Sequence, residues 1–297
     1  MSDFVQQQNS ISDFATSDSW VILSPIEQSI KKKIEAVGTP LKDWDINIYR
    51  GVLTGCNEAF IISSEKRDEI LANCQTEDER KRTEELIRPI LRGRDIKRYG
   101  YVDSGLYLIN THNGVRGRIP RIKIEDYPAV KAHLDQYWDK IATRADKGDT
   151  PYNLRNCAYL EDFSRPKIIW KRIGSILRFS FDNKGCLGLD STCFAAGEHI
   201  EYLCCVLNSL MGHYLLKDSP KTGTGDLLVS VQAIEPARIP YYAQYDRQLS
   251  PLLGLQIANP SNDTEKEIND IVFTMYGLSP NEREYVTQYV KLSQQSL

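Results

Sequence analysis

Two stretches of the sequence gather basic side chains around a glycine. The basic residues of the first stretch are Arg92, Arg94, Lys97 and Arg98, and those of the second are Arg116, Arg118 and Arg121. A glycine lets the backbone come close to a ligand, and a guanidinium group either neutralises a phosphate or donates two hydrogen bonds to a guanine edge. These residue types and spacings therefore indicate contact with a nucleic acid.

Further candidates for the same chemistry lie beside predicted strand ends or in a polar loop. They are Arg50, Lys167, Lys171, Arg172, Lys221 and Thr222. Each has a structural alternative, because residues 50–55 can form a tight turn and residues 221–225 can form an ordinary exposed loop. Trp170 lies between Lys167 and Lys171, and we expect it in the core rather than stacked on a base.

The net charge of −3 is distributed unevenly along the chain. Residues 80–123 carry 12 basic and 4 acidic side chains, and residues 165–184 carry 6 basic and 1 acidic, whereas residues 1–79 carry 7 basic and 14 acidic. Two basic segments in an otherwise acidic chain are what a surface that binds a polyanion requires. The alternative is that both segments are solvated faces of ordinary helices and strands.

Catalytic motifs are missing from the sequence. An amino-methyltransferase needs an N-P-P-[YFW] loop, but the one Asn-Pro pair, Asn259-Pro260, is followed by Ser261 and Asn262. No glycine-rich cofactor turn, phosphate-binding loop or G-x-S-x-G sequence is present, and the four histidines are scattered. We therefore expect no catalysis by this chain alone, no metal site and no cofactor in it.

One alternative keeps a catalytic role. Metal-dependent nucleases use an acidic residue followed by [DE]-x-K, and both Asp95-Ile96-Lys97 and Asp182-Asn183-Lys184 match the second part. Such pairs arise often by chance. The second lies in a predicted turn, and Asp95 is expected instead to orient Arg94 or Arg98.

Length and composition are those of a globular protein with one large or two small domains. The chain has 297 residues, of which 41% are hydrophobic and 26% charged, and no apolar run is long enough to span a membrane. The N-terminus lacks the features of a secretory signal. Seven cysteines at irregular spacing, without C-x-x-C, indicate free thiols in a reducing compartment, so we expect a cytoplasmic protein.

Capping and periodicity signals predict a mixture of helices and strands. Ser24, Pro25 and Glu27 form a capping box with proline at the first helical position, and Ser279 and Glu282 repeat the pattern. The predicted helices cover residues 25–36, 77–86, 126–144, 200–216, 265–276 and those from 279 onward. The predicted strands cover residues 45–49, 106–110, 167–170 and 176–181, with 59–62 returning beside 45–49.

These elements predict an α+β fold in which a curved mixed or antiparallel sheet is packed against helices. We expect residues 1–19 to form a linker or disordered arm, because they are polar and of low complexity. We expect residues 20–250 to form the main domain and residues 251–297 to form a C-terminal helical extension.

Several strings occur in a fixed order along the chain. They are WDINIYRGVLTGCNEAFII (44–62), IRPILRGRDIKRY (87–99), PKIIW (166–170), residues 203–210 with LNS, RIP (238–240), and the tail strings INDIV (268–272) and YGL (276–278). In this order they resemble the TaqI-like C-terminal specificity domain of type IIG restriction-modification enzymes and related adenine-specific DNA methyltransferases. The resemblance extends from about residue 20 to about residue 290.

The resemblance implies sequence-specific recognition of double-stranded DNA, opposite a methyltransferase domain or subunit that would bind S-adenosylmethionine. That catalytic half is absent from this chain. Within such a module we expect Arg92 and Lys97 to contact phosphates, and Arg116, Arg118 and residues 221–225 to reach base edges. Two alternatives remain: a nuclease that uses Asp95 and Lys97, and an interaction subunit that does not bind DNA.

Overall fold

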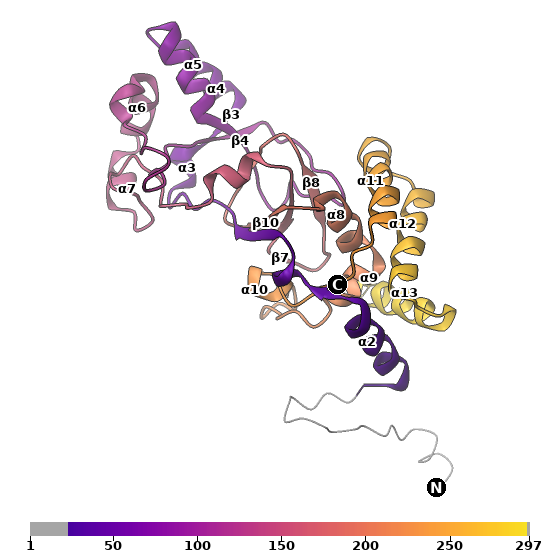
Figure 1. Ribbon diagram of the computed structural model, residues 1–297. Coiled ribbons are helices and arrows are strands. Elements are labelled where there is room, and N and C mark those ends of the chain that lie inside the picture. Colours follow the sequence, from indigo (N-terminus) through magenta and orange to yellow (C-terminus); the bar gives the residue numbers. More distant parts are fainter. Residues whose placement is uncertain (1–22, 296–297) are drawn as a thin grey trace, which may run out of the picture.

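The computed structural model describes residues 23–295 and has the α+β architecture expected from the sequence, with antiparallel and mixed sheets and C-terminal helices. Figure 1 shows α4 (Ser64–Ala72), α5 (Glu77–Leu86), α6 (Pro128–Asp135) and α7 (Trp138–Thr143) at one end of the molecule. At the other end are α11 (Ala243–Ala258), α12 (Asn262–Met275) and α13 (Pro280–Gln295), and the sheets lie between the two groups. The linker expected at residues 1–19 lies outside the described residues.

The first sheet is antiparallel and has the strand order β2-β10-β6-β8. Its strands are β2 (Ile46–Arg50), β10 (Thr192–Gly197), β6 (Lys167–Lys171) and β8 (Phe179–Asp182). The second sheet has the order β3-β5-β4-β9, in which only the β4–β9 pairing is parallel. Its strands are β3 (Ile61–Ser63), β5 (Leu106–Ile109), β4 (Ile87–Leu91) and β9 (Leu187–Gly188).

Two small ribbons and several short helices complete the fold. The ribbons pair β1 (Thr39–Pro40) with β12 (Arg238–Ile239) and β7 (Ile173–Gly174) with β11 (Leu227–Leu228). The remaining α-helices are α2 (Pro25–Val37), α3 (Asn57–Phe60), α8 (Ile200–Asn208), α9 (Leu210–Leu215) and α10 (Val231–Ile234). The 3-10 helices are Leu41–Asp43, Ile124–Asp126 and Leu160–Ser164.

The first sheet separates two hydrophobic cores. In β6, Ile168 and Trp170 pack with α2 and the C-terminal helices, whereas Ile169 packs with the second sheet and α6. Side chains alternate between the two faces of a strand, so this division shows that β6 is buried on both faces. The first sheet therefore holds the two halves of the molecule together, and the ends of its strands have a fixed position relative to both.

Several predicted elements have the bounds of the observed ones. The Ser24–Glu27 capping box starts α2, α5 coincides with residues 77–86, and β5, β6 and β8 lie within one to three residues of their predicted bounds. The predicted helices 126–144 and 200–216 are each divided in two. In the second of them, the Ser209 side chain accepts a hydrogen bond from Gly212 N and so caps a new helix.

Two predictions about the chain path are wrong. Residues 59–62 do not return beside β2, because Gly55, with φ of +66°, turns the chain into α3 and β3 then pairs with β5. In addition, α11 was not expected. Pro251 lies inside this helix, so the boundary expected at residue 251 falls within a continuous element.

Glu282 links α13 to α2 through several hydrogen bonds. Its carboxylate accepts from Ser29 Oγ at 2.7 Å, Lys33 Nζ at 2.6 Å and Ser279 N at 2.7 Å, and its side chain is 6% exposed. Burial by itself would raise the pKa of this carboxyl, but the hydrogen bonds from Lys33, Ser279 and Ser29 lower it to about 2.

Glu282→Gln is therefore expected to destabilise the protein at neutral pH, by on the order of 2–3 kcal/mol. Since the pKa is lower in the folded chain than the ordinary value of 4.5, this stabilisation is present above pH 4.5 and disappears as the pH falls toward 2. Urea unfolding of the unaltered chain and of Glu282→Gln at about pH 7, 4 and 3 measures this stabilisation. A difference in the free energy of unfolding that stays constant over this pH range would contradict the lowered pKa of Glu282.

Candidate nucleic-acid interface

The ends of three strands bring basic residues from distant parts of the sequence together. Arg50 ends β2 and pairs with Cys193, while Lys171 ends β6 and pairs with Thr192. The end of β4 joins them, because Leu91 pairs with Gly188 and Gly93 N donates to Ser191 Oγ at 3.3 Å. Arg50, Arg92, Arg94, Lys171 and Arg172 therefore surround the turn between β9 and β10. We call these five residues the strand-end cluster.

Glycines allow the close approach on which this cluster depends. A Cβ atom on Gly51 would lie 2.1 Å from Leu189 O, which leaves no space for any other residue. A Cβ atom on Gly93 would lie 2.9 Å from Lys171 Cγ, so the Arg92–Arg94 backbone passes directly against the Lys171 side chain. Gly93, which the sequence suggested would let the backbone approach a ligand, lets it approach β6.

Three members of the strand-end cluster are not neutralised by the protein. Arg94 and Lys171 are exposed and Arg172 is half-buried, and within residues 23–295 none of these side chains makes an ion pair. Arg172 N donates to Ser191 O at 3.0 Å, which fixes its backbone beside the turn. Arg50 differs, because it pairs with Asp190 at 3.4 Å. The cluster thus carries several charges that remain available to an anion.

Arg92 is held by a buried carboxylate. Its Nε and Nη2 atoms donate to the two oxygens of Asp95, each at 3.0 Å, and its backbone N donates to Oδ2 at 2.8 Å. Burial by itself would raise the pKa of Asp95, but the hydrogen bonds from Arg92 hold it below its usual value. The expectation that Asp95 orients Arg94 or Arg98 is wrong, because the turn directs this carboxylate to Arg92.

A two-stranded ribbon and a small hairpin extend from the same end of the first sheet. Strand β7 directly follows Lys171 and Arg172 and pairs with β11, and residues 221–227 form the hairpin, in which Lys221 pairs with Leu227. At its tip, Thr222 Oγ1 lies 2.8 Å from Thr224 Oγ1, and Gly225 N donates to Thr222 O at 2.9 Å. The tip residues 221–225 therefore form a hydrogen-bonded turn within the polar loop expected from the sequence.

The second basic stretch lies on a neighbouring loop. Arg118 donates to Ala158 O at 3.1 Å and pairs with Glu161 at 3.2 Å, Arg121 pairs with Asp149 at 3.1 Å, and Arg116 is exposed. Tyr159, which follows Ala158, donates a hydrogen bond from its hydroxyl to Arg50 O at 2.9 Å. Residues 158–159 therefore connect this loop to the strand-end cluster, but two of its three arginines already have acidic partners.

Arg98 contacts the C-terminal helices, whereas Lys97 turns back toward Arg94. Arg98 donates to the Asn208 carbonyl and pairs with Glu265 of α12, so it anchors the 92–101 segment to the helices. Lys97 is exposed, and its Nζ donates to Arg94 O at 3.2 Å. Arg98 is thus tied to α12, whereas Lys97 stays in contact with Arg94.

Lys167 cannot contact a ligand, contrary to the expectation from its strand position. Both Lys167 and Asp182 have completely buried side chains, which form an ion pair. Lys167 also donates to Phe163 O at 2.7 Å, and Asp182 accepts from Tyr101 Oη at 2.8 Å and from Cys186 N at 3.0 Å. Because β6 is buried on both faces, this lysine is part of the interior.

Sequence reasoning missed the residues that organise the cluster. Ser191, which bonds Gly93, and Asp190, which pairs with Arg50, lie in a short turn without a recognisable motif. Asp95 was expected to orient an arginine, but Arg94 or Arg98 rather than Arg92. Its spacing of three residues from Arg92 was the only local signal for the ion pair that forms.

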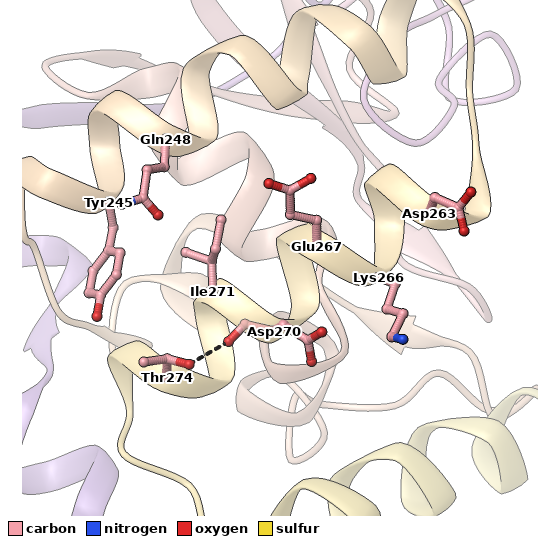
Figure 2. Close-up of a pocket in the computed structure, with 8 residues that line it drawn as sticks. All are labelled: Tyr245, Gln248, Asp263, Lys266, Glu267, Asp270, Ile271 and Thr274. Carbon is pink, nitrogen blue, oxygen red and sulfur yellow. Dashed lines mark hydrogen bonds between the residues drawn. The ribbon is translucent and has the colours of Figure 1, made fainter.

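A separate pocket on the C-terminal helices has the wrong charge for a polyanion. Figure 2 shows this cavity of about 470 Å³ between α11, which contributes Tyr245 and Gln248, and α12. Helix α12 supplies Asp263, Lys266, Glu267 and Asp270 to its wall, so acidic groups dominate. Among residues 23–295, no three His, Cys, Asp or Glu side chains are arranged to hold a metal ion.

In the described part of the chain, none of the helices combines the length and apolar character needed to cross a membrane.

Comparison with known proteins gives structural neighbours only. No protein-family model and no curated protein matches this sequence. The fold is similar to part of MmeI, a type IIL restriction-modification enzyme whose structure was determined in complex with DNA, with a TM-score of 0.58 and 10% sequence identity. The match covers 88% of this chain and 37% of MmeI.

A second structure similar to this chain is that of the type IIG restriction endonuclease BpuSI, with a TM-score of 0.43 and 13% identity over 87% of this chain and 34% of BpuSI. The chain thus spans little more than one third of the length of either neighbour. The likeness to MmeI shows a shared fold with part of a type II restriction-modification enzyme.

Proposed function

We propose that this chain is the specificity module of a restriction-modification DNA methyltransferase and recognises double-stranded DNA through the strand-end cluster. The observation that carries the proposal is the meeting of basic residues from β2, β4 and β6 around one turn. These residues lie up to 122 positions apart in the sequence, from Arg50 to Arg172. If the basic segments were only the solvated faces of helices and strands, nothing would require their side chains to meet around one turn.

The charges of the cluster fit a phosphate backbone. Arg94, Lys171 and Arg172 have no acidic partner in residues 23–295, so they can replace the counterions of several phosphates. The hairpin tip at residues 221–225 and the arginines on the 116–121 loop lie beyond the cluster and supply further donors for base edges or backbone. The structure of MmeI, part of which has a similar fold, was determined in complex with DNA, and this supports a role of the chain in DNA binding.

The finer parts of the proposal come from the sequence resemblance. They are the TaqI-like type of specificity domain, a methyltransferase domain or subunit as partner, and S-adenosylmethionine bound by that partner. We place the recognition region at residues 20–250 and a helical extension at 251–297, with α11 continuous across this boundary. Because the chain covers 37% of MmeI, catalysis belongs to the remainder of such an enzyme in this proposal.

The nuclease alternative would require Asp95 to bind a metal ion. Both oxygens of Asp95 instead accept hydrogen bonds from Arg92, and Ser104 Oγ donates to Oδ2 at 3.3 Å. This contact favours a role of Asp95 in shaping the cluster. Incubation of plasmid DNA with the chain and Mg²⁺ distinguishes the two functions, because cleavage that is lost in Asp95→Ala would support the nuclease.

Arg94→Ala tests the proposed surface. We expect weaker binding to every duplex and a log–log salt slope that is flatter by about one, because one phosphate contact is lost. The matched control is Arg80→Ala, which removes an exposed arginine on α5, away from the cluster. Fluorescence anisotropy at several salt concentrations measures both variants. Equal slopes for Arg94→Ala and the unaltered chain would contradict the proposal.

A further inference from the structure

Arg92 and Asp95 form a closed unit within the strand-end cluster. Besides the three hydrogen bonds from Arg92, Asp95 N donates back to Arg92 O at 2.9 Å, and Ser104 Oγ donates to Asp95 Oδ2. The Asp95 side chain is 6% exposed and that of Arg92 is 22% exposed. The turn therefore presents a supported guanidinium, in contrast to the neighbouring Arg94, which is exposed and makes no ion pair within residues 23–295.

The geometry of this pair leaves one edge of the guanidinium available. Arginine has five N–H donors, and Asp95 accepts from Nε and from one hydrogen of Nη2. The remaining donors lie on Nη1 and on the outer side of Nη2. Such an edge can donate two hydrogen bonds to O6 and N7 of guanine in the major groove.

The ion pair also changes what Arg92 can contribute to binding. Its charge is compensated by Asp95 at 3.0 Å, so it displaces fewer counterions than an unpaired arginine would. A side chain that is already fixed loses little conformational entropy on binding, and directional contacts benefit most from this. Both effects favour contact with a base over contact with a phosphate.

We propose that Asp95 is a positioning residue that holds Arg92 to read a guanine edge, while Arg94 and Lys171 contact phosphates. This inference rests on the proposed function, since it assigns roles within the same DNA-binding surface. It replaces the expectation from sequence that Arg92 is a phosphate contact.

The test selects bound sequences from a duplex library with about 20 randomised base pairs, using the full chain. The unaltered chain is expected to enrich a motif that contains guanine, and Arg92→Ala to lower the preference for one guanine by about 5- to 150-fold. Asp95→Asn is expected to weaken the preference at that same position. Arg94→Ala is the matched control, which should keep the motif and flatten the salt slope by about one.

Arg92→Lys keeps the test valid if Asp95→Asn fails to fold, as judged by thermal unfolding. Lysine retains the positive charge beside Asp95 but cannot form two parallel hydrogen bonds. We expect it to lose the guanine preference with a nearly unchanged salt slope. Loss of preference in Arg92→Ala and Arg92→Lys supports the inference.

Two results would overturn the inference. In one, Arg92→Ala keeps the motif and flattens the salt slope as Arg94→Ala does, which would make Arg92 a phosphate contact. In the other, the unaltered chain binds duplex DNA without enriching any motif. Failure of the proposed function is distinct from both, because the unaltered chain would then bind no duplex at any salt concentration.

Discussion

Replacing Arg94, Lys171 and Arg172 together by glutamine is expected to weaken duplex binding by on the order of 100-fold and to flatten the log–log salt slope by about 2.7. Each of these side chains lacks an acidic partner within residues 23–295, and all three lie around the same turn. Each lost phosphate contact removes about 0.9 from the slope. Anisotropy titrations of one labelled duplex at several salt concentrations measure both quantities.

A charge-matched control separates the surface from net charge. Lys32 on α2 and Arg80 and Lys81 on α5 are exposed, make no ion pair within residues 23–295 and lie on other parts of the molecule. Their replacement by glutamine changes the net charge by the same amount and is expected to reduce affinity only slightly. Equal losses in the two triple variants would mean that the strand-end cluster has no special role.

Asp182→Ala is expected to lower the free energy of unfolding by about 3–5 kcal/mol, because it leaves the buried Lys167 ammonium without its counterion. The pKa of Asp182 is held below its usual value, since the effect of Lys167 and of the hydrogen bonds outweighs burial, which by itself would raise it. Urea unfolding at neutral pH measures the loss. A decrease below about 1 kcal/mol would show that water or another group satisfies Lys167.

The double variant Lys167→Met/Asp182→Leu is the matched comparison. It removes both charges together, and replacement of a buried ion pair by apolar residues is often neutral or stabilising. We expect it to recover most of the stability that Asp182→Ala loses. Its DNA binding should keep the salt slope of the unaltered chain, because Lys167 is completely buried and contacts no phosphate in this account.

Local signals in the sequence predicted several of the helices and strands, but not α11 or the inner strands β4 and β10. The hydrogen bond from Glu27 N to Ser24 Oγ in the structure is the one that the Ser-Pro-x-Glu sequence indicates. The break between α8 and α9 had a weaker signal, because its capping residue, Ser209, is a single hydroxyl residue in an otherwise apolar run. Pro251 was misleading, since a proline that usually marks a helix start lies in the interior of α11.

The composition of the site was predictable, but its arrangement was not. The sequence named the basic residues that the structure groups in the strand-end cluster, but this grouping depends on pairings such as Arg50 with Cys193, which no local pattern encodes. Arg98 was placed with Arg92, although it pairs with Glu265, 167 positions away. Lys167 was misassigned because the sequence of one strand does not reveal that both of its faces are covered.

The salt dependence of duplex binding by the unaltered chain tests the central claim most directly. The account predicts that the chain binds a labelled 30-base-pair duplex at about 50 mM salt and that log K falls with log salt with a slope near −4, roughly one for each available cation around the turn and the adjacent hairpin. Absence of binding at that salt concentration, or binding with a slope near zero, would contradict the claim that this surface recognises DNA.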